Sequence, residues 1–120
     1  MKIACATSGI DLDASLDSRF GRALKFLIYD TETKAFTLVD NQQNLQATQG
    51  AGIQSAQTVA ASGVQVLIAG HCGPKAYRVL AAANIKVYTT TAGTVAEALS
   101  LYQEGKLSES SAADVEGHWA

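Results

Sequence analysis

One short segment constrains the fold of this chain more than any other: the run Gln-Val-Leu-Ile-Ala at 65–69, followed by Gly-His-Cys-Gly-Pro at 70–74. After its first residue the run is continuously apolar, without the alternation expected of a strand that has one face in water. Such a strand is covered on both faces, as in a parallel sheet. Pro74 suits the first turn of a helix, so we predict a buried central strand that leads into a helix.

The other elements follow from periodicity and from start and stop signals. Gly63 and Asn84 supply the left-handed residues that end helices, and Thr94 and Glu97 have the spacing of a capping box. We expect strands at 3–6, 25–30, 35–41, 65–69 and 85–89, and helices at 53–62, 74–83 and 95–104. Residues 7–22 and 42–49 are expected to be loops, with a hairpin turn at 31–34.

This element order predicts an α/β domain with a five-stranded mixed sheet and helices on its faces. A helix that connects two adjacent strands requires them to be parallel. The first strand is short and apolar, so it should lie beside 65–69, with the hairpin extending the other edge. We assign residues 1–107 to this domain and 108–120 to a loose, polar C-terminal tail.

Composition excludes several classes of protein. A net charge of −2 produces no field that would attract nucleic acid or an anionic membrane. No apolar run reaches the ~18 residues that a membrane-spanning helix needs. The two cysteines lack metal-site or disulfide-framework spacing, which favours free thiols in a reducing cytoplasm.

Chemistry-bearing residues gather where the predicted parallel strands end, at 7–9, 70–74 and 90–93. In open α/β sheets this edge is where ligands bind. Within 70–74, the following helix would stabilise anions and lower the pKa of the Cys72 thiol. The structural alternative is that Cys72 is a small buried residue, as we expect for Cys5.

Two further segments can contribute to an anion site. The first is Arg-Phe-Gly-Arg at 19–22, which can hold a polyanion through its guanidinium groups or anchor a loop through Phe20. The second is Gly-Ala-Gly-Ile at 50–53, a helix N-terminus with free amides. It lacks a third glycine and a preceding strand, so nucleotide binding is only weakly supported. Lys75 and Arg78 add positive charge nearby.

These motifs, taken in order, resemble a known family. The resemblance rests on Ser-Arg-Phe-Gly-Arg-Ala at 18–23, Gly-Ala-Gly-Ile-Gln at 50–54, Val-Leu-Ile-Ala-Gly at 66–70 and Gly-Pro-Lys-Ala at 73–76. It spans roughly residues 1–107 and points to the dinitrogenase iron–molybdenum cofactor biosynthesis domains of NifX, NafY and the C-terminal part of NifB. His71 and Cys72 within the glycine loop resemble the orange-protein branch.

The resemblance implies a three-layer α/β/α fold of the ribonuclease-H-like type, without nuclease activity, in proteins that carry or store metal–sulfur clusters. For this branch it implies a molybdenum–copper sulfide cluster held without covalent attachment, with Mrp/MinD-type P-loop ATPases as partners. We therefore predict a non-catalytic cluster carrier that is a monomer or a weak homodimer. The alternatives are a cysteine-dependent redox or thiol-transfer enzyme, and an interaction module for those ATPases.

The predicted site combines all of these segments. Its metal ligand is Cys72. Its cluster-binding residues are Ser8, Gly9, Arg19, Phe20, Gly21, Arg22, Gly50, Ala51, Gly52, Ile53, Gly70, His71, Gly73, Pro74, Lys75, Thr91 and Gly93.

Overall fold

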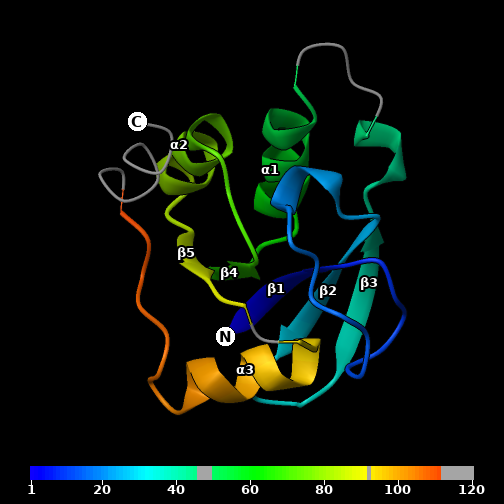
Figure 1. The fold of residues 1–120 in the computed structure, drawn as a ribbon, viewed down its shortest axis with the longest axis vertical. Coiled ribbons are helices and arrows are strands. Elements are labelled where there is room, and N and C mark those ends of the chain that lie inside the picture. The colour runs from blue at the N-terminus through cyan, green and yellow to red at the C-terminus, as the bar shows by residue number, and fades with distance from the viewer. Residues whose placement is uncertain (46–49, 92, 112–120) are drawn as a thin grey trace.

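Two parallel strands that are buried on both faces form the centre of the sheet (Figure 1). In the computed structural model, which describes residues 1–45, 50–91 and 93–111, these are β1 (Lys2–Thr7) and β4 (Val66–Ala69). They pair in the register Ile3↔Val66 and Cys5↔Ile68. Every residue of β4 is at most 2% exposed, so the prediction of a fully covered central strand is confirmed.

The sheet has five strands in the order β3-β2-β1-β4-β5. β1 pairs antiparallel with β2, and β2 with β3, whereas β4 is parallel to both β1 and β5. The mixed five-stranded sheet, the central place of the first strand and the hairpin at its edge are therefore as predicted. The remaining elements are β2 (Lys25–Asp30), β3 (Phe36–Asp40), β5 (Lys86–Thr89), α1 (Ala51–Ala61), α2 (Pro74–Ala82), α3 (Val95–Gln103), and the 3-10 turns η1 (Phe20–Arg22) and η2 (Gln42–Asn44).

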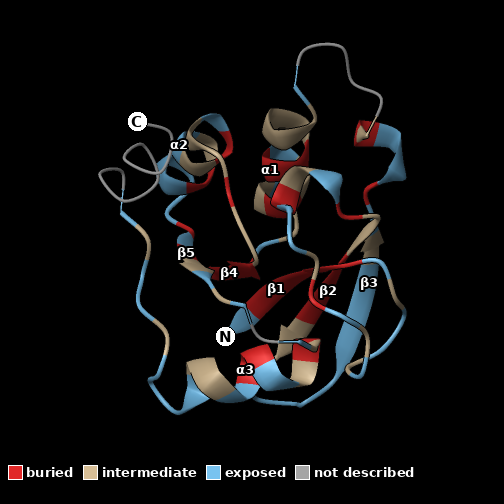
Figure 2. Cartoon of the chain, in the orientation of Figure 1, coloured by how far each residue is buried: buried red, intermediate tan, exposed pale blue. Residues whose placement is uncertain are grey.

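The helices divide between the two faces of the sheet, which gives three layers (Figure 2). α1 and α2 cover one face, where Val59 and Leu80 pack with Leu67 of β4. α3 covers the other face, where Leu99 packs with Ile68. Each layer follows from the helical spacing of apolar residues in the sequence. Within the described residues, none of the helices is long and apolar enough to cross a membrane.

Helix boundaries agree with the sequence signals, with one shift at the start of α1. Gly63 and Asn84 have φ angles of 74° and 62° just after α1 and α2, as a left-handed helix stop requires. α1 begins at Ala51, two residues earlier than expected. Gly52 lies in the first turn of α1 and not in its middle, where glycine is destabilising.

The sequence does not predict the buried polar network that Asn41 and Asn44 form beside α1. Asn41 is fully buried and donates hydrogen bonds to the Ala23 carbonyl at 2.8 Å and to Ser55 Oγ at 3.0 Å. Asn44 of η2 donates to Asn41 Oδ1 and to Thr58 Oγ1. The segment 42–49, expected to be a loop, therefore starts as a turn tied to α1, and its residues 46–49 lie outside the described part.

The C-terminal segment is attached to the sheet for part of its length. Glu109 forms an antiparallel bridge with Tyr88 of β5, and the Ser110 amide donates to the Val87 carbonyl at 2.7 Å. The Tyr77 hydroxyl donates to the Ser110 carbonyl at 3.2 Å. The expectation of a loose tail is wrong for these residues, because the exposed edge of β5 offers backbone partners. Residues 112–120 lie outside the described part.

The loop after β1 returns across the ends of the central strands and meets β4 at Gly70. The Gly70 amide donates to the Asp17 carbonyl at 3.0 Å, and the Asp17 amide donates to the Ala6 carbonyl at 2.7 Å. A Cβ atom placed on Gly70 would lie 2.5 Å from Ser18 Cα. Only glycine permits this contact, which ties the loop and the η1 turn after it to the sheet.

We predict that Gly70→Ala destabilises the fold by about 1–3 kcal/mol, because the new methyl group meets backbone atoms that can move only with the loop. Gly73→Ala is the matched control. A Cβ there has no atom within 4 Å, so the cost should stay within about 1 kcal/mol, the loss expected from replacing a glycine N-cap. Urea unfolding followed by circular dichroism measures both, and equal losses would contradict the prediction.

Candidate functional site

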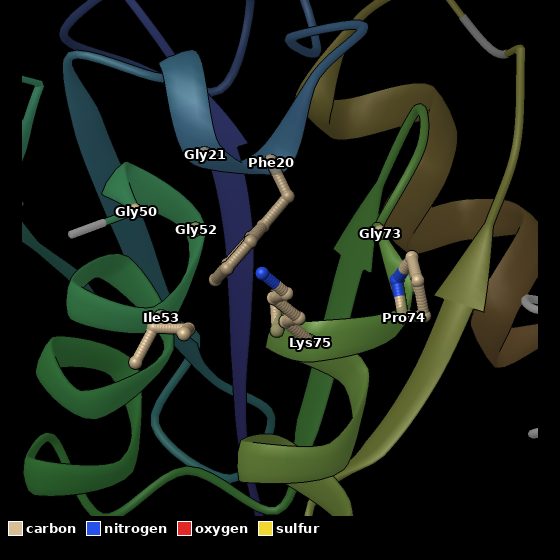
Figure 3. Close-up of a pocket in the computed structure, with 9 residues that line it drawn as sticks. Phe20, Gly21, Gly50, Gly52, Ile53, Gly73, Pro74 and Lys75 are labelled. Atoms are coloured by element: carbon tan, nitrogen blue, oxygen red, sulfur yellow. The ribbon is translucent and has the colours of Figure 1, made fainter.

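A pocket opens between the N-terminal ends of α1 and α2, with η1 across its top (Figure 3). It encloses about 610 Å³, within the range of about 300–1,000 Å³ typical of small-ligand sites. Its lining comes from three segments far apart in the sequence: Phe20, Gly21, Gly50, Gly52, Ile53, Gly73, Pro74, Lys75 and Ala76.

The η1 turn is held in place by contacts with both neighbouring segments. The Phe20 amide donates to the His71 carbonyl at 2.9 Å, and the Phe20 ring lies 5.3 Å from that of Phe26. A Cβ on Gly21 would lie 3.0 Å from Gly52 Cα, so η1 rests against the first turn of α1. Phe20 is 1% exposed and also lines the pocket, so it both anchors the loop and forms a wall.

Both helices that open onto the pocket begin without a side-chain cap. Gly50 and Gly73 are their N-cap residues, and neither first turn contains an acidic residue. α3 differs: Thr94 Oγ1 accepts a hydrogen bond from the Glu97 amide at 3.1 Å, and Glu97 brings a carboxylate to its first turn. Free amides and positive helix-dipole ends therefore converge on the pocket, where they favour an anion.

The remaining lining adds one cation and several apolar surfaces. Lys75 extends from α2 into the space between the two helices, toward Phe20 and Ile53 (Figure 3). Phe20, Ile53 and Pro74 supply apolar walls. Arg19 and Arg22 are exposed on either side of Phe20 and do not line the pocket. The arrangement can hold a compact anion whose surface is only weakly hydrated and can contact the apolar walls.

The structure brings only part of the predicted site together. The predicted residues that line this pocket are Phe20, Gly21, Gly50, Gly52, Ile53, Gly73, Pro74 and Lys75. Ala76 also lines the pocket, although the predicted site residues do not include it. Its position one residue after Lys75, in the same first turn, is the signal that could have found it.

Ser8 and Gly9 lie in a separate pocket of about 480 Å³ at the end of β1, which Asp17 also lines. Ser8 Oγ donates to Asp17 Oδ2 at 2.8 Å. The Gly93 carbonyl accepts from the Leu16 amide at 3.0 Å, and neither Gly93 nor Thr91 lines the pocket between α1 and α2. The loop 8–18 folds back over the strand ends, and Ser8 and Gly9 line the pocket formed within this loop.

Cys72 lies beneath the pocket surface, in the core. Its side chain is 2% exposed, belongs to the apolar cluster under α1 and α2, and does not line the pocket. Burial raises the pKa of the Cys72 thiol to about 12, so the expected lowering by the helix N-terminus is wrong. Cys5 is fully buried in the core as expected, and burial raises its pKa to about 12 as well.

Metal ligation by Cys72 stays a prediction. Its Sγ lies 3.8 Å from the Gly73 carbonyl oxygen, a contact that needs no metal. The described residues contain no group of three or more His, Cys, Asp or Glu side chains able to hold a metal ion. Gly70 and His71 contribute through the backbone contacts that hold the loop and η1.

Comparisons with known proteins identify the family of this chain and support its fold. The family described as dinitrogenase iron-molybdenum cofactor matches residues 1–105. An uncharacterized protein of Methanocaldococcus jannaschii is 35% identical over 95 residues, 77% of this chain and 80% of that protein. The apo form of the orange protein from Desulfovibrio gigas has a TM-score of 0.88 and 40% identity, covering 92% of each chain. A putative NifB protein from Thermotoga has a TM-score of 0.78 and 38% identity, covering 90% of this chain and 91% of its own.

We predict that Cys72 reacts very slowly with a thiol reagent while the protein is folded. At pH 8, a thiol with a pKa near 12 is about one ten-thousandth thiolate, and burial also blocks access. In the Cys5→Ala variant, labelling by a disulfide reagent should be slow when native and fast in urea, and the native rate should rise with pH up to about 12. Native labelling as fast as in urea would instead indicate an activated thiol.

Proposed function

We propose that this chain, which belongs to the dinitrogenase iron-molybdenum cofactor family, binds an anionic metal–sulfur cluster in the pocket between α1 and α2 and carries it without catalysing a reaction. The observation that carries this proposal is the convergence of two uncapped helix N-termini on one pocket. A carrier needs a site that holds its cargo and releases it, and non-covalent binding by amides and charge has that property.

Each charged or dipolar group stabilises the anion only modestly. The contributions add because the groups face the same pocket. An anion at one helix N-terminus is stabilised by about 0.3–1 kcal/mol at an exposed site, and more where water is partly excluded. Two helices and Lys75 act on the same volume. Because both first turns lack acidic residues, no carboxylate of those turns competes with the ligand for the amides.

The apolar walls favour sulfide over oxide as the surface of the anion. Phe20, Ile53 and Pro74 cannot replace the water that surrounds a small oxyanion, and desolvating such an ion is costly. Sulfide is a softer and more polarizable surface, which suits contact with apolar walls. Because the orange protein of Desulfovibrio gigas is 40% identical over 92% of this chain, we propose a molybdenum–copper sulfide cluster as the cargo.

This mode of binding needs no bond from Cys72 to a metal. Such a bond would require the thiol to leave the core and lose its proton, against a pKa of about 12. The same burial weighs against a cysteine-dependent enzyme, which needs an accessible thiolate. We include Mrp/MinD-type P-loop ATPases as partners, which the family resemblance implies. We propose the cytoplasm as the compartment because free thiols suit a reducing environment.

We predict that the chain retains molybdenum and copper after anaerobic mixing with tetrathiomolybdate and Cu(I), followed by desalting. Gly52→Leu should weaken retention about tenfold or more, because a Cβ there has only ordinary contact, 3.6 Å from Ala76 Cβ, and the larger side chain would occupy the pocket. Ala61→Leu, at the exposed far end of α1, is the control and should bind as the wild type does. Bound metals and the visible charge-transfer spectrum measure retention.

The outcomes of this experiment separate the proposal from its alternatives. If the wild type retains no metal, the carrier function is wrong. If Gly52→Leu retains the cluster and Cys72→Ser loses it, the cluster binds at the thiol and the proposed pocket is wrong.

We also predict that Lys75→Gln weakens cluster binding about two- to fivefold, the effect expected for one partly exposed charge. Since salt screens such charges, its affinity should depend less on ionic strength than that of the wild type. Lys86→Gln on β5 removes the same charge away from the pocket and should leave binding unchanged. Titration at two salt concentrations measures all three proteins, and equal effects of the two variants would contradict a local role for Lys75.

A further inference from the structure

The two edges of the sheet differ in whether a further segment of the chain pairs with them. At the β5 edge, Glu109 bridges to Tyr88 and the Ser110 amide donates to the Val87 carbonyl, so a further segment already pairs with this strand. At the opposite edge, β3 pairs with β2 alone among the residues that the structure describes. Phe36–Asp40 contains no proline or lysine, the residues that commonly protect an exposed edge. β3 therefore presents an edge that can accept another strand.

The backbone register defines which groups of β3 face outward. The Asp30 amide donates to the Ala35 carbonyl at 2.9 Å, and two residues further along Thr37 lies opposite Ile28. Because hydrogen-bonded pairs alternate in an antiparallel ladder, residues 35, 37 and 39 direct their backbone groups toward β2. The amides and carbonyls of residues 36, 38 and 40 then point away from the sheet.

The side chains along this edge are unusually apolar for exposed positions. Phe36 and Leu38 are 36% and 37% exposed, two of the four large apolar side chains that the described residues leave exposed. They lie opposite Tyr29 and Leu27 of β2, which belong to the face covered by α3. Figure 2 shows β3 exposed along this outer edge. An additional strand there would bury both side chains.

We propose that β3 pairs antiparallel with β3 of a second copy of this chain, about a two-fold axis at Thr37, so that one sheet continues through both copies. In this register Phe36 lies opposite Leu38 of the other copy, and the outward backbone groups of each pair face one another. Lys34, just before the strand, lies opposite Asp40, so opposite charges meet at both ends.

The neighbouring registers that keep the same hydrogen-bond parity are less favourable. Centring the pair on Leu38 would place the Phe36 ring opposite the Asp40 carboxylate. Centring it on Phe36 would place Glu32 opposite Asp40, and like charges directly opposite are destabilising. Self-complementarity in charge and in apolar contact therefore selects a second copy in a single register. β3 does not line the pocket, so this interface is independent of the proposed cargo.

The interface can be tested by sedimentation velocity of the full chain. The concentration series should reach about 1 mM. We expect a monomer–dimer equilibrium that Leu38→Lys weakens about tenfold or more, since it places two lysines near the axis and removes apolar contact. Ala61→Lys, an exposed change on α1, is the control and should leave the equilibrium unchanged. A wild type that stays monomeric throughout, or a dimer that Leu38→Lys does not weaken, would overturn the proposal.

A cross-linking experiment tests the register. Thr37 and its counterpart would form a non-hydrogen-bonded pair with Cα atoms about 4.5 Å apart, within disulfide range. Thr37→Cys should therefore form a disulfide-linked dimer on mild oxidation with oxidised glutathione. Thr33→Cys, exposed in the hairpin turn, should not, and both native cysteines are buried. Faster linkage through residue 33 than through residue 37 would rule out this register.

Discussion

Covering both faces of β1 and β4 is the requirement on which the rest of the structure depends. The side chains of Val66–Ala69 are almost completely removed from water, so neither face of the sheet can be left open. Parallel neighbours need crossover connections, and helices in those connections supply the cover. The same connectivity brings the first turns of α1 and α2 near the carboxyl ends of the central strands, where open α/β sheets bind ligands. The candidate site is therefore a consequence of how the core is covered.

The three α-helices differ in whether a side chain caps their N-terminus. α3 has the complete Thr94–Glu97 cap, of a type worth about 0.5–2 kcal/mol. α1 and α2 begin at glycines with no acidic residue in their first turns, so their amides stay available toward the pocket. Helix ends that give up a stabilising cap beside one pocket are consistent with a site selected for an anionic ligand.

Cys72 illustrates how magnitudes decide between two opposing effects. A helix N-terminus stabilises a nearby anion by about 0.3–1 kcal/mol, which would lower a thiol pKa by less than about one unit. Burial acts in the opposite direction and raises the pKa of Cys72 to about 12. Desolvation wins because the side chain points into the core beneath α1 and α2. The sequence places this thiol next to a helix end but does not reveal which way it faces.

The sequence by itself determined the element order, the central strand, the strand order, the helix stops at Gly63 and Asn84 and the α3 cap, because these depend on local periodicity and backbone preference. Three segments of the pocket were also predictable, since glycines beside helix starts are visible in the sequence. Tertiary structure alone decided which of them meet: Gly70 contacts the loop, η1 lies against α1, Cys72 is buried in the core and Ser8 lies in a separate pocket. Such choices depend on contacts between residues far apart in the chain, and no local pattern encodes them.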